Sequence, residues 1–356
     1  MNILYMKHEK TGEGMLMVWK KSILGLLVGG LTFFVAGCQE QGDASGLNVN
    51  QEPMVQATAT LETEGEPDMT FSFDGGQGSI YTIDGPAADR DFVFLGERIV
   101  YAHGAIYRHG EGYRPPKDGK QDTDDWQELY ELPVKERKIK GRFGIEASIG
   151  SGAESGYNLA SCGGYVLFER SKDGMLGLYD GKRSYVGTVP WQKEYSGMVG
   201  TAGGELLMVR SPDTICIGKL AGAAISEVRD VVPHALDELQ LSQAALRPVR
   251  LNEDELFVSV SQGDGTGEKL CCFDREGNLL ACYEGDYSNK TDWAVTENYV
   301  LQSSGDNLSI YKLTTGKKLF AGTLKDLHVK CMYTLDGDRV LVCGYYKRAM
   351  FFVLEL

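Results

Sequence analysis

The sequence predicts an all-β fold, a β-propeller of six blades, with seven blades as the alternative. From residue 69 onward, short runs rich in Val, Ile, Leu, Phe and Tyr alternate with turns rich in Gly, Asp and Asn. Groups of such strands recur about every 40–50 residues, a spacing typical of propeller blades. A single blade cannot bury both of its faces, so repeats of this kind must pack against one another in a ring.

The repeats can be located from their apolar strands. The clearest unit, residues 298–322, contains a strand, a Gly-Asp-Asn turn, a second strand, a Thr-Gly turn and a third strand. The first strands of the units are predicted at Ile99, Val166, Leu206, Phe257, Val300 and Val340, in steps of 67, 40, 51, 43 and 40 residues. The two long steps require insertions, which we predict to be a loop over 103–125 and a helix over 233–246.

The last unit is one strand short of a full blade. Two strand-like segments near the start of the repeats, 70–73 and 80–83, have no unit of their own. We expect one of these N-terminal strands to complete the final blade and close the ring, because closure removes the exposed edges of the sheet.

Residues 20–38 have the order of a secretory signal. Lys20 and Lys21 precede an apolar run over 22–34, and small residues and a cysteine follow it. A cationic start, a short apolar centre and a small-residue end are typical of a cleaved leader. The run has 13 residues, whereas a membrane-spanning helix needs roughly 20.

Four residues after this run resemble the lipobox of bacterial lipoproteins: Val35, Ala36, Gly37 and Cys38. The resemblance implies that the sulfur of Cys38 carries a diacylglycerol and that Cys38 becomes the first residue of the mature chain. It also implies attachment to the outer face of the bacterial cell membrane, for which two acyl chains suffice. We predict no further cofactor.

The chain is predicted to have three parts. Residues 1–37 form the signal peptide, with Met15 or Met17 as an alternative start. Residues 38–68 contain the lipidated cysteine and a tether rich in Gln, Glu, Gly, Ala and Thr, whose apolar surface is too small to fold. Residues 69–356 form the propeller, and a hydrophobic content of 42% for the whole chain is sufficient for its core.

The segment 314–320, Thr-Thr-Gly-Lys-Lys-Leu-Phe, resembles the repeats of quinoprotein-like, YVTN and WD40-like propellers. Those families usually carry a tryptophan where this chain has Phe320, and only this unit matches well. The resemblance therefore concerns the fold alone, and a fold does not specify an activity.

Seven cysteines remain besides Cys38, and an odd number cannot all pair. Cys271 and Cys282 flank a turn at 275–278, and a hairpin centred on it sets them opposite each other, within reach of a disulfide. Cys331 and Cys343 also flank a turn, but its centre predicts a register one residue off, with the two side chains on opposite faces. The other interpretation, buried thiols throughout, stays open.

Four common catalytic motifs are absent from the sequence: it lacks a nucleophile elbow, a phosphate-binding loop, a zinc-protease helix and a dinucleotide fingerprint. The candidate metal ligands are His103, His109, Asp122, Asp124 and Asp125, and we predict no metal because solvated loops explain them more simply. Residues 1–37 have a net charge of +2, so the whole-chain charge of −14 leaves −16 on the mature protein, which argues against nucleic acid as a partner.

We therefore predict a membrane-anchored extracytoplasmic lipoprotein whose non-catalytic propeller binds a protein, peptide or glycan. The alternative is a cell-envelope hydrolase or lyase, because a propeller can assemble an active site from residues far apart in the sequence. Inward-facing carboxylates, His or Arg at the mouth of the funnel favour the enzyme. A smooth apolar or aromatic patch on one rim favours the binding module.

Overall fold

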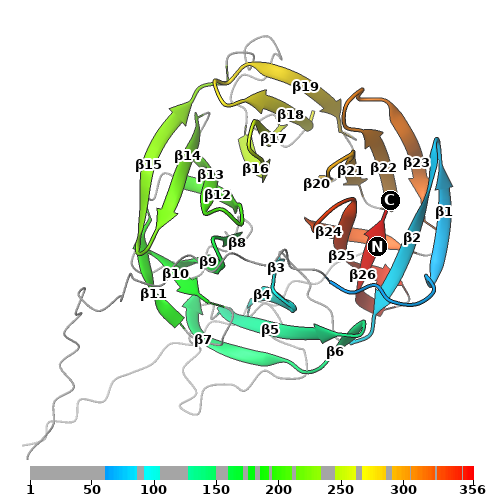
Figure 1. Ribbon diagram of the computed structural model, residues 1–356, viewed down its shortest axis with the longest axis horizontal. Helices are drawn as coiled ribbons and strands as arrows, with labels where there is room; N and C mark the ends of the chain where they lie inside the picture. Colours follow the sequence, from blue (N-terminus) through cyan, green and yellow to red (C-terminus); the bar gives the residue numbers. More distant parts are fainter. Residues whose placement is uncertain are drawn as a thin grey trace, which may run out of the picture. The chain divides into compact units, whose positions relative to one another are not determined.

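A computed structural model describes residues 61–85, 92–104, 127–149, 159–170, 175–180, 185–191, 195–210, 214–233, 245–261, 267–285, 291–304, 306–324, 327–346 and 348–356. Throughout these ranges the regular elements are β-strands, arranged in six antiparallel sheets (Figure 1). The prediction of an all-β propeller with six blades is confirmed.

Each sheet is one blade. Blade 1 contains β3 (Phe92–Leu95), β4 (Arg98–Gly104), β5 (Gln127–Lys135), β6 (Lys138–Ile139) and β7 (Phe143–Ile149). Blade 2 contains β8 (Leu159–Cys162), β9 (Tyr165–Arg170), β10 (Met175–Tyr179) and β11 (Tyr185–Pro190). Blade 3 contains β12 (Tyr195–Gly200), β13 (Glu205–Arg210), β14 (Thr214–Ala221) and β15 (Ala224–Val231).

The other three blades follow in chain order. Blade 4 contains β16 (Ala245–Leu251), β17 (Glu255–Ser261), β18 (Lys269–Asp274) and β19 (Leu279–Glu284). Blade 5 contains β20 (Thr291–Val295), β21 (Tyr299–Ser304), β22 (Asn307–Lys312) and β23 (Lys318–Thr323). Blade 6 contains β24 (His328–Thr334), β25 (Arg339–Tyr346), β26 (Arg348–Glu355), β2 (Gly76–Ile83) and β1 (Met69–Phe73).

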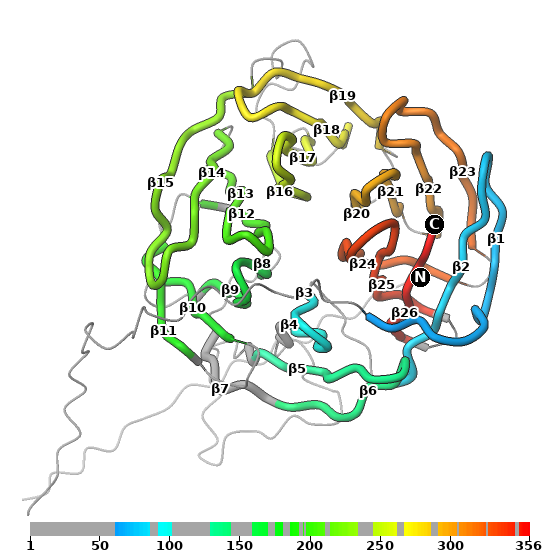
Figure 2. Tube along the Cα trace, viewed as in Figure 1, coloured from blue at the N-terminus to red at the C-terminus, as the bar shows by residue number. Residues whose placement is uncertain are grey.

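The first strand of each blade lies at the centre of the ring. These innermost strands, β3, β8, β12, β16, β20 and β24, each contact the next one in order, and β24 contacts β3 (Figure 2). The contacts therefore form a closed circuit around a central axis.

The ring is closed by a strand from the N-terminal end of the propeller, as predicted. β2 pairs antiparallel with β26, with Ile80 opposite Leu354 and Ile83 opposite Phe351. β1 then adds a fifth strand outside β2. Both spare segments are thus used, one to close the ring and one to extend the edge of blade 6.

The spacing of the repeats was predicted correctly, but their starting point was one strand late. The strands predicted as first in each unit are β4, β9, β13, β17, β21 and β25, which are second in each blade. The helix predicted over 233–246 is wrong at its end, because β16 begins at Ala245. Residues 234–244 and most of the predicted loop over 103–125 lie outside the described residues, whereas His103 belongs to β4.

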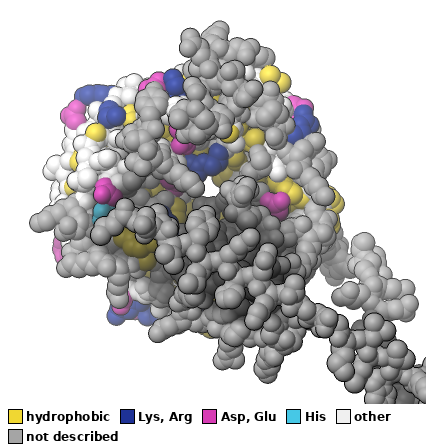
Figure 3. All heavy atoms as spheres, turned by 180° about the vertical axis from the view of Figure 1, so that it is seen from behind, with side chains coloured by type: hydrophobic (Ala, Val, Ile, Leu, Met, Phe, Trp, Pro, Cys, Tyr) yellow, Lys and Arg dark blue, Asp and Glu magenta, His cyan; other side chains and the backbone are white. Residues whose placement is uncertain are grey.

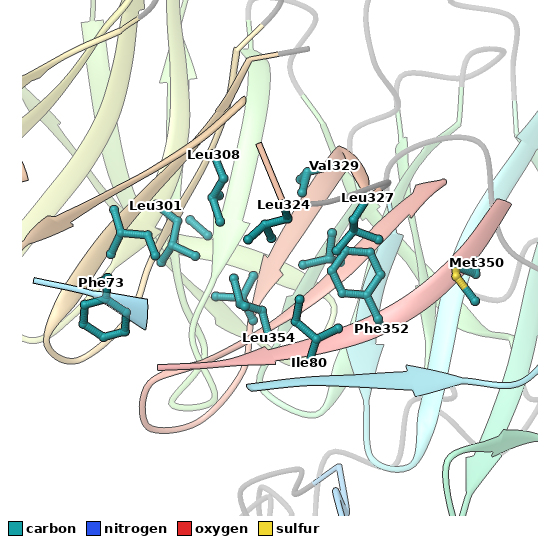
Figure 4. Close-up of a cluster of buried hydrophobic side chains, with 14 residues drawn as sticks. Phe73, Ile80, Leu301, Leu308, Leu324, Leu327, Val329, Met350, Phe352 and Leu354 are labelled. Atoms are coloured by element: carbon teal, nitrogen blue, oxygen red, sulfur yellow. The ribbon is translucent and has the colours of Figure 1, made fainter. Parts of the chain in front are cut away.

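The core is divided among the junctions between blades. The buried apolar residues of the described ranges form six clusters, one at each junction. Figure 4 shows the cluster between blades 5 and 6, where Leu301 and Leu308 face Phe352 and Leu354. Because each blade is covered on both faces, its second strand is apolar at successive positions rather than alternating.

The middle of β17 illustrates this division. Leu256 and Val258 lie in the cluster shared with blade 3, and Phe257 between them lies in the cluster shared with blade 5. All three side chains have no exposed surface. Burying one such side chain contributes about 1.5–3 kcal/mol, so the ring is held together mainly by these apolar junctions.

Candidate binding site

A pocket of about 140 Å³ lies where the innermost strands of all six blades meet. Each of these strands contributes to its wall, with Phe92, Ser161, Met198, Arg247, Trp293 and Met332 as one residue from each. In the space-filling view from behind, basic side chains lie beside the central opening (Figure 3). The pocket thus combines aromatic and thioether walls with charged groups.

Irregular strand pairing shapes this wall. β12, β16 and β24 each shift register against the second strand of their blade, at 195–197, 248–250 and 329–331. A bulge of this kind bends the strand and changes the direction of nearby side chains. β16 also contains Pro248. Proline has no backbone N–H, and it is tolerated here because β16 is an edge strand whose inner side pairs with no other strand of the sheet.

Arg247 and Asp292 form the charged side of the pocket. Arg247 Nη1 donates to Asp292 Oδ1 at 3.0 Å, and Nη2 donates to the backbone oxygen of Thr291 at 3.2 Å. The other carboxylate oxygen, Asp292 Oδ2, accepts from the backbone N–H of Met332 at 2.6 Å. These bonds connect blades 4, 5 and 6 across their inner edges.

A second carboxylate, Glu268, lies close to the same guanidinium. Its Oε1 is 3.8 Å from Arg247 Nη2, and it accepts from the Ser259 hydroxyl and, at 3.1 Å, from Trp293 Nε1. The Glu268 side chain is only 15% exposed, and these donors replace the water that a buried carboxylate loses. We refer to Arg247, Glu268 and Asp292 as the axial charge cluster.

The axial charge cluster can exchange hydrogen bonds with a polar group that enters the pocket. Arg247 is its most accessible member, with 48% of its side chain exposed against 19% for Asp292. An entering group therefore meets a guanidinium that is already paired, and binds by competing with or extending that pair. One guanidinium faces two carboxylates, so the cluster carries a formal charge of −1.

The described residues contain neither a metal-binding cluster nor a membrane-spanning helix. In that part of the chain, no group of three or more His, Cys, Asp or Glu side chains is placed to hold a metal ion. The same residues include no helix whose length and apolar character would allow it to cross a membrane.

The residues singled out from the sequence lie elsewhere. The lipobox residues Val35, Ala36, Gly37 and Cys38, together with His109, Asp122, Asp124 and Asp125, lie outside the described residues. His103 is in β4, opposite Glu128 on β5. Cys271 and Cys282 are direct partners on β18 and β19, and a disulfide between them stays a prediction.

The register predicted for Cys331 and Cys343 is wrong. The two cysteines are direct partners on β24 and β25. Thr334 pairs with Val340, which leaves five residues in the connection rather than the four that the sequence indicated. One additional residue shifts every pair along the hairpin by one position, and this shift brings the two side chains to the same face.

Sequence reasoning missed the axial charge cluster. Arg247 and Asp292 are 45 residues apart, close to the length of one blade repeat. They occupy similar places near the start of two innermost strands, which are short and weakly patterned compared with the second strands. The available signal was a charged residue that precedes the apolar second strand in two successive repeats, Arg247 before β17 and Asp292 before β21.

No protein-family model matches the sequence, and no curated protein matches it. Among solved structures, BamB from Moraxella catarrhalis is similar over 78% of this chain and 98% of that one, with 11% identity and a TM-score of 0.42. A protein of unknown function from Bacteroides caccae is similar over 62% of this chain and 80% of that one, with 13% identity and a TM-score of 0.40. Similarities at this level do not bear on the function.

Proposed function

We propose that this protein is a lipid-anchored module on the outer face of the bacterial cell membrane that binds a protein or peptide partner through the axial pocket. The observation that carries the binding role is the pocket itself, to which all six blades contribute. Each innermost strand contacts the next around the ring, so the six strands together form a preformed wall.

The size of the pocket favours a partner that inserts one side chain. Sites that enclose a small-molecule ligand have volumes of about 300–1,000 Å³, whereas this pocket measures about 140 Å³. A side chain projecting from a larger partner fits such a volume, and the rest of the partner rests on the surrounding face. Arg247, the most accessible member of the axial charge cluster, then offers hydrogen bonds to a polar side chain.

The proposed location rests on the sequence. The lipobox residues Val35, Ala36, Gly37 and Cys38 follow a short apolar run, and the acidic mature chain is repelled by anionic headgroups, so the lipid must supply the attachment. Leu61 is buried in the cluster between blades 6 and 1, so the tether extends over 39–60 at most, and as a flexible coil its root-mean-square span is about 25 Å. That length holds the propeller clear of the membrane surface.

Replacing the lipidated cysteine tests the anchor. The Cys38→Ser variant is expected to stay as an unprocessed precursor or to leave the membrane fraction, whereas Cys272→Ser, a buried cysteine of blade 4, keeps the distribution of the original chain. Fractionation and mass measurement of both variants give the answer. Mature Cys38→Ser protein in the membrane fraction contradicts the anchor.

Site-specific photo-crosslinking in intact cells tests the binding role. A photoreactive amino acid at position 332, in the pocket wall, is expected to give one adduct of defined mass. The same residue at position 228, 43% exposed on the outer strand β15, is expected to give none. Adducts of equal yield at both positions, or none at 332, contradict binding on the axis.

A matched pair of arginine variants separates recognition from folding. Arg247→Met is expected to reduce the adduct at position 332 about tenfold, or ~1.4 kcal/mol. Arg210→Met removes a comparable Arg–Asp pair, with Asp230 on the outer strand of blade 3, and is expected to leave the adduct unchanged. Equal losses in both variants indicate a general effect on stability.

The second function, a cell-envelope hydrolase or lyase, is favoured by one observation: the carboxylates of Glu268 and Asp292 lie 3.8 and 3.0 Å from the guanidinium of Arg247, which lines the axial pocket. Such a pair can supply a general acid and a general base. If the pocket is catalytic, Glu268→Gln and Asp292→Asn each lower turnover of an envelope glycan or peptide at least about 100-fold. Wild-type protein that releases no product from purified envelope material excludes this alternative.

A further inference from the structure

The hairpin of β18 and β19 places two cysteines face to face. The turn between these strands is fixed by Asp274, whose Oδ1 accepts the backbone N–H of Glu276 at 3.0 Å and of Asn278 at 2.8 Å. With that turn in place, Cys271 and Cys282 are direct cross-strand partners. Their sulfur atoms are 2.8 Å apart, less than about 1 Å beyond the length of an S–S bond.

The two thiols differ in access and in acidity. Cys271 has no exposed surface, while Cys282, on the outer strand of the blade, is half-buried. The Cys271 thiol donates to the Cys282 sulfur and thereby lowers the pKa of Cys282, and the charge of Lys269 acts in the same direction. The same contact raises the pKa of Cys271. Cys282 is therefore the thiol that ionises first and the one that a reagent reaches.

We propose that Cys271 and Cys282 form a disulfide in the mature protein and that the outer strand of blade 4 is thereby linked to its neighbour. The oxidant is an external disulfide of the kind that thiol oxidoreductases or oxidised glutathione provide. The proposal draws on the proposed function only for the oxidising location; the geometry of the pair is independent of it.

The reaction proceeds in two exchanges. The Cys282 thiolate attacks one sulfur of the external disulfide, forms a mixed disulfide and expels the first external thiolate. Cys271 then loses its proton and attacks the Cys282 sulfur, which breaks the mixed bond and expels the second external thiolate. Two protein thiols are oxidised, one external disulfide is reduced to two thiols, and the two protons released by the protein pass to those products.

The neighbouring residue is a built-in control. Cys272 is on the same strand and is buried, but its cross-strand partner is Ala281. It points to the opposite face, into the cluster shared with blade 5. A cysteine that is adjacent in sequence but has no sulfur opposite it should stay a thiol under conditions that oxidise the pair.

Peptide mapping of the full mature chain, alkylated in denaturant before any reduction, tests the pairing. We expect a linked peptide containing Cys271 and Cys282, lighter by two hydrogen atoms, with Cys272 alkylated. Cys271→Ala and Cys282→Ala are expected to lower the urea midpoint by the same amount, and Cys272→Ala to leave the linked peptide intact. A dithiol reductant should remove the difference between the original chain and the first two variants.

Oxidised glutathione added to the purified, reduced chain separates this proposal from the proposed location. If the pair is linked in protein isolated from cells, both stand. If the pair is alkylated in isolated protein but becomes linked with glutathione, the pairing stands and the extracytoplasmic location fails. If Cys271 and Cys282 are still alkylated after glutathione, the disulfide proposal is overturned.

Discussion

At the scale of single residues, the contact between Glu205 and Arg275 shows how one ion pair joins two blades. Arg275, in the turn of blade 4, donates from both terminal nitrogens to the Glu205 carboxylate of blade 3, at 2.8 and 2.9 Å. It also donates to the backbone oxygen of Asn252 at 2.6 Å. The Arg275 bonds lower the pKa of Glu205 below its ordinary value of 4.5, because they stabilise the charged carboxylate.

This lowered pKa predicts a pH-dependent contribution to stability. The contribution of Glu205 is fully present above its pKa in the unfolded chain and is lost as the pH falls through the lower pKa of the folded chain. Glu205→Gln is therefore expected to lower the free energy of unfolding by about 1 kcal/mol at pH 7, a value reduced for solvent screening because the side chain is 37% exposed. The two proteins should converge as the pH falls through the folded-state pKa of Glu205, which lies below 4.5.

Urea unfolding at a series of pH values measures this difference. Glu136→Gln is the control, because Glu136 is 66% exposed and its nearest cations are 4.0 Å away; it should change the free energy of unfolding by less than about 0.5 kcal/mol. A Glu205→Gln penalty that does not shrink in acid would falsify the assignment of the effect to the carboxylate charge.

Residue pairs within one hairpin could be predicted from the sequence, and pairs between blades could not. The turn residues 275–278 were sufficient to place Cys271 opposite Cys282. The same reasoning failed for Cys331 and Cys343 because the connection is one residue longer than its Gly-Asp signal suggested. Arg247 and Asp292 meet only because blades 4 and 5 are neighbours in the ring, and no local pattern contains that information.

At the scale of the element, the β18–β19 hairpin depends on one glycine. Gly277 has a φ of +92°, and a Cβ atom at this position would lie 2.3 Å from the backbone oxygen of Val232 in blade 3. The turn thus needs a residue without a side chain for two reasons: the left-handed backbone conformation and the close approach of the neighbouring blade. A substitution must strain the turn and also displace the end of β15.

Comparing two glycines separates these two costs. Gly316, in the turn between β22 and β23, has a φ of +66°, and a Cβ atom there would meet nothing within 4 Å beyond its chain neighbours. Gly316→Ala is expected to lower the free energy of unfolding by about 1 kcal/mol. Gly277→Ala is expected to lower it by about 2–4 kcal/mol, since the Val232 carbonyl must also move. If urea unfolding shows the same loss of free energy for both variants, displacing the Val232 carbonyl of blade 3 does not destabilise the protein.

The innermost strands explain why the element boundaries were shifted in the sequence analysis. β3 and β8 have four residues each and β20 has five, and each is a short run beside a longer second strand. A run of four or five residues contains too few positions to show a clear periodicity, so its pattern is weak. The strong second strands were identified and the weak first strands, which build the pocket, were not.

At the scale of the whole molecule, closure of the ring follows from burial at the junctions between blades. Each blade has two apolar faces, and each of the six clusters joins one blade to the next, including blade 6 to blade 1. The sequence predicted this closure because a propeller with an unfinished last blade exposes a strand edge. The sequence did not decide whether segment 70–73 or segment 80–83 closes the ring, since both are short and apolar. In the structure β2 closes the ring and β1 extends the sheet beyond it.

Closure by β2 predicts a graded response to shortening the chain. β2 buries Ile80 and Ile83, at 3% and 1% exposure, and covers the edge of β26. Those two side chains alone contribute about 3–6 kcal/mol, a large part of the roughly 5–15 kcal/mol typical of a whole domain. A chain starting at residue 85 should therefore lose its cooperative transition and aggregate, because β26 becomes an open edge next to two exposed clusters.

A chain starting at residue 75 is the matched control, since it lacks β1 but keeps β2. It loses Leu61 and Phe73, 4% and 9% exposed, but the ring stays closed, and the free energy of unfolding falls by about 3–6 kcal/mol. Thermal unfolding and gel filtration of the two chains distinguish the roles of the strands. Equal midpoints for both would mean that β2 does not close the ring. Recovery of the monomer when a peptide of residues 61–84 is added to the shorter chain would show that pairing with β26, rather than chain length, holds the propeller together.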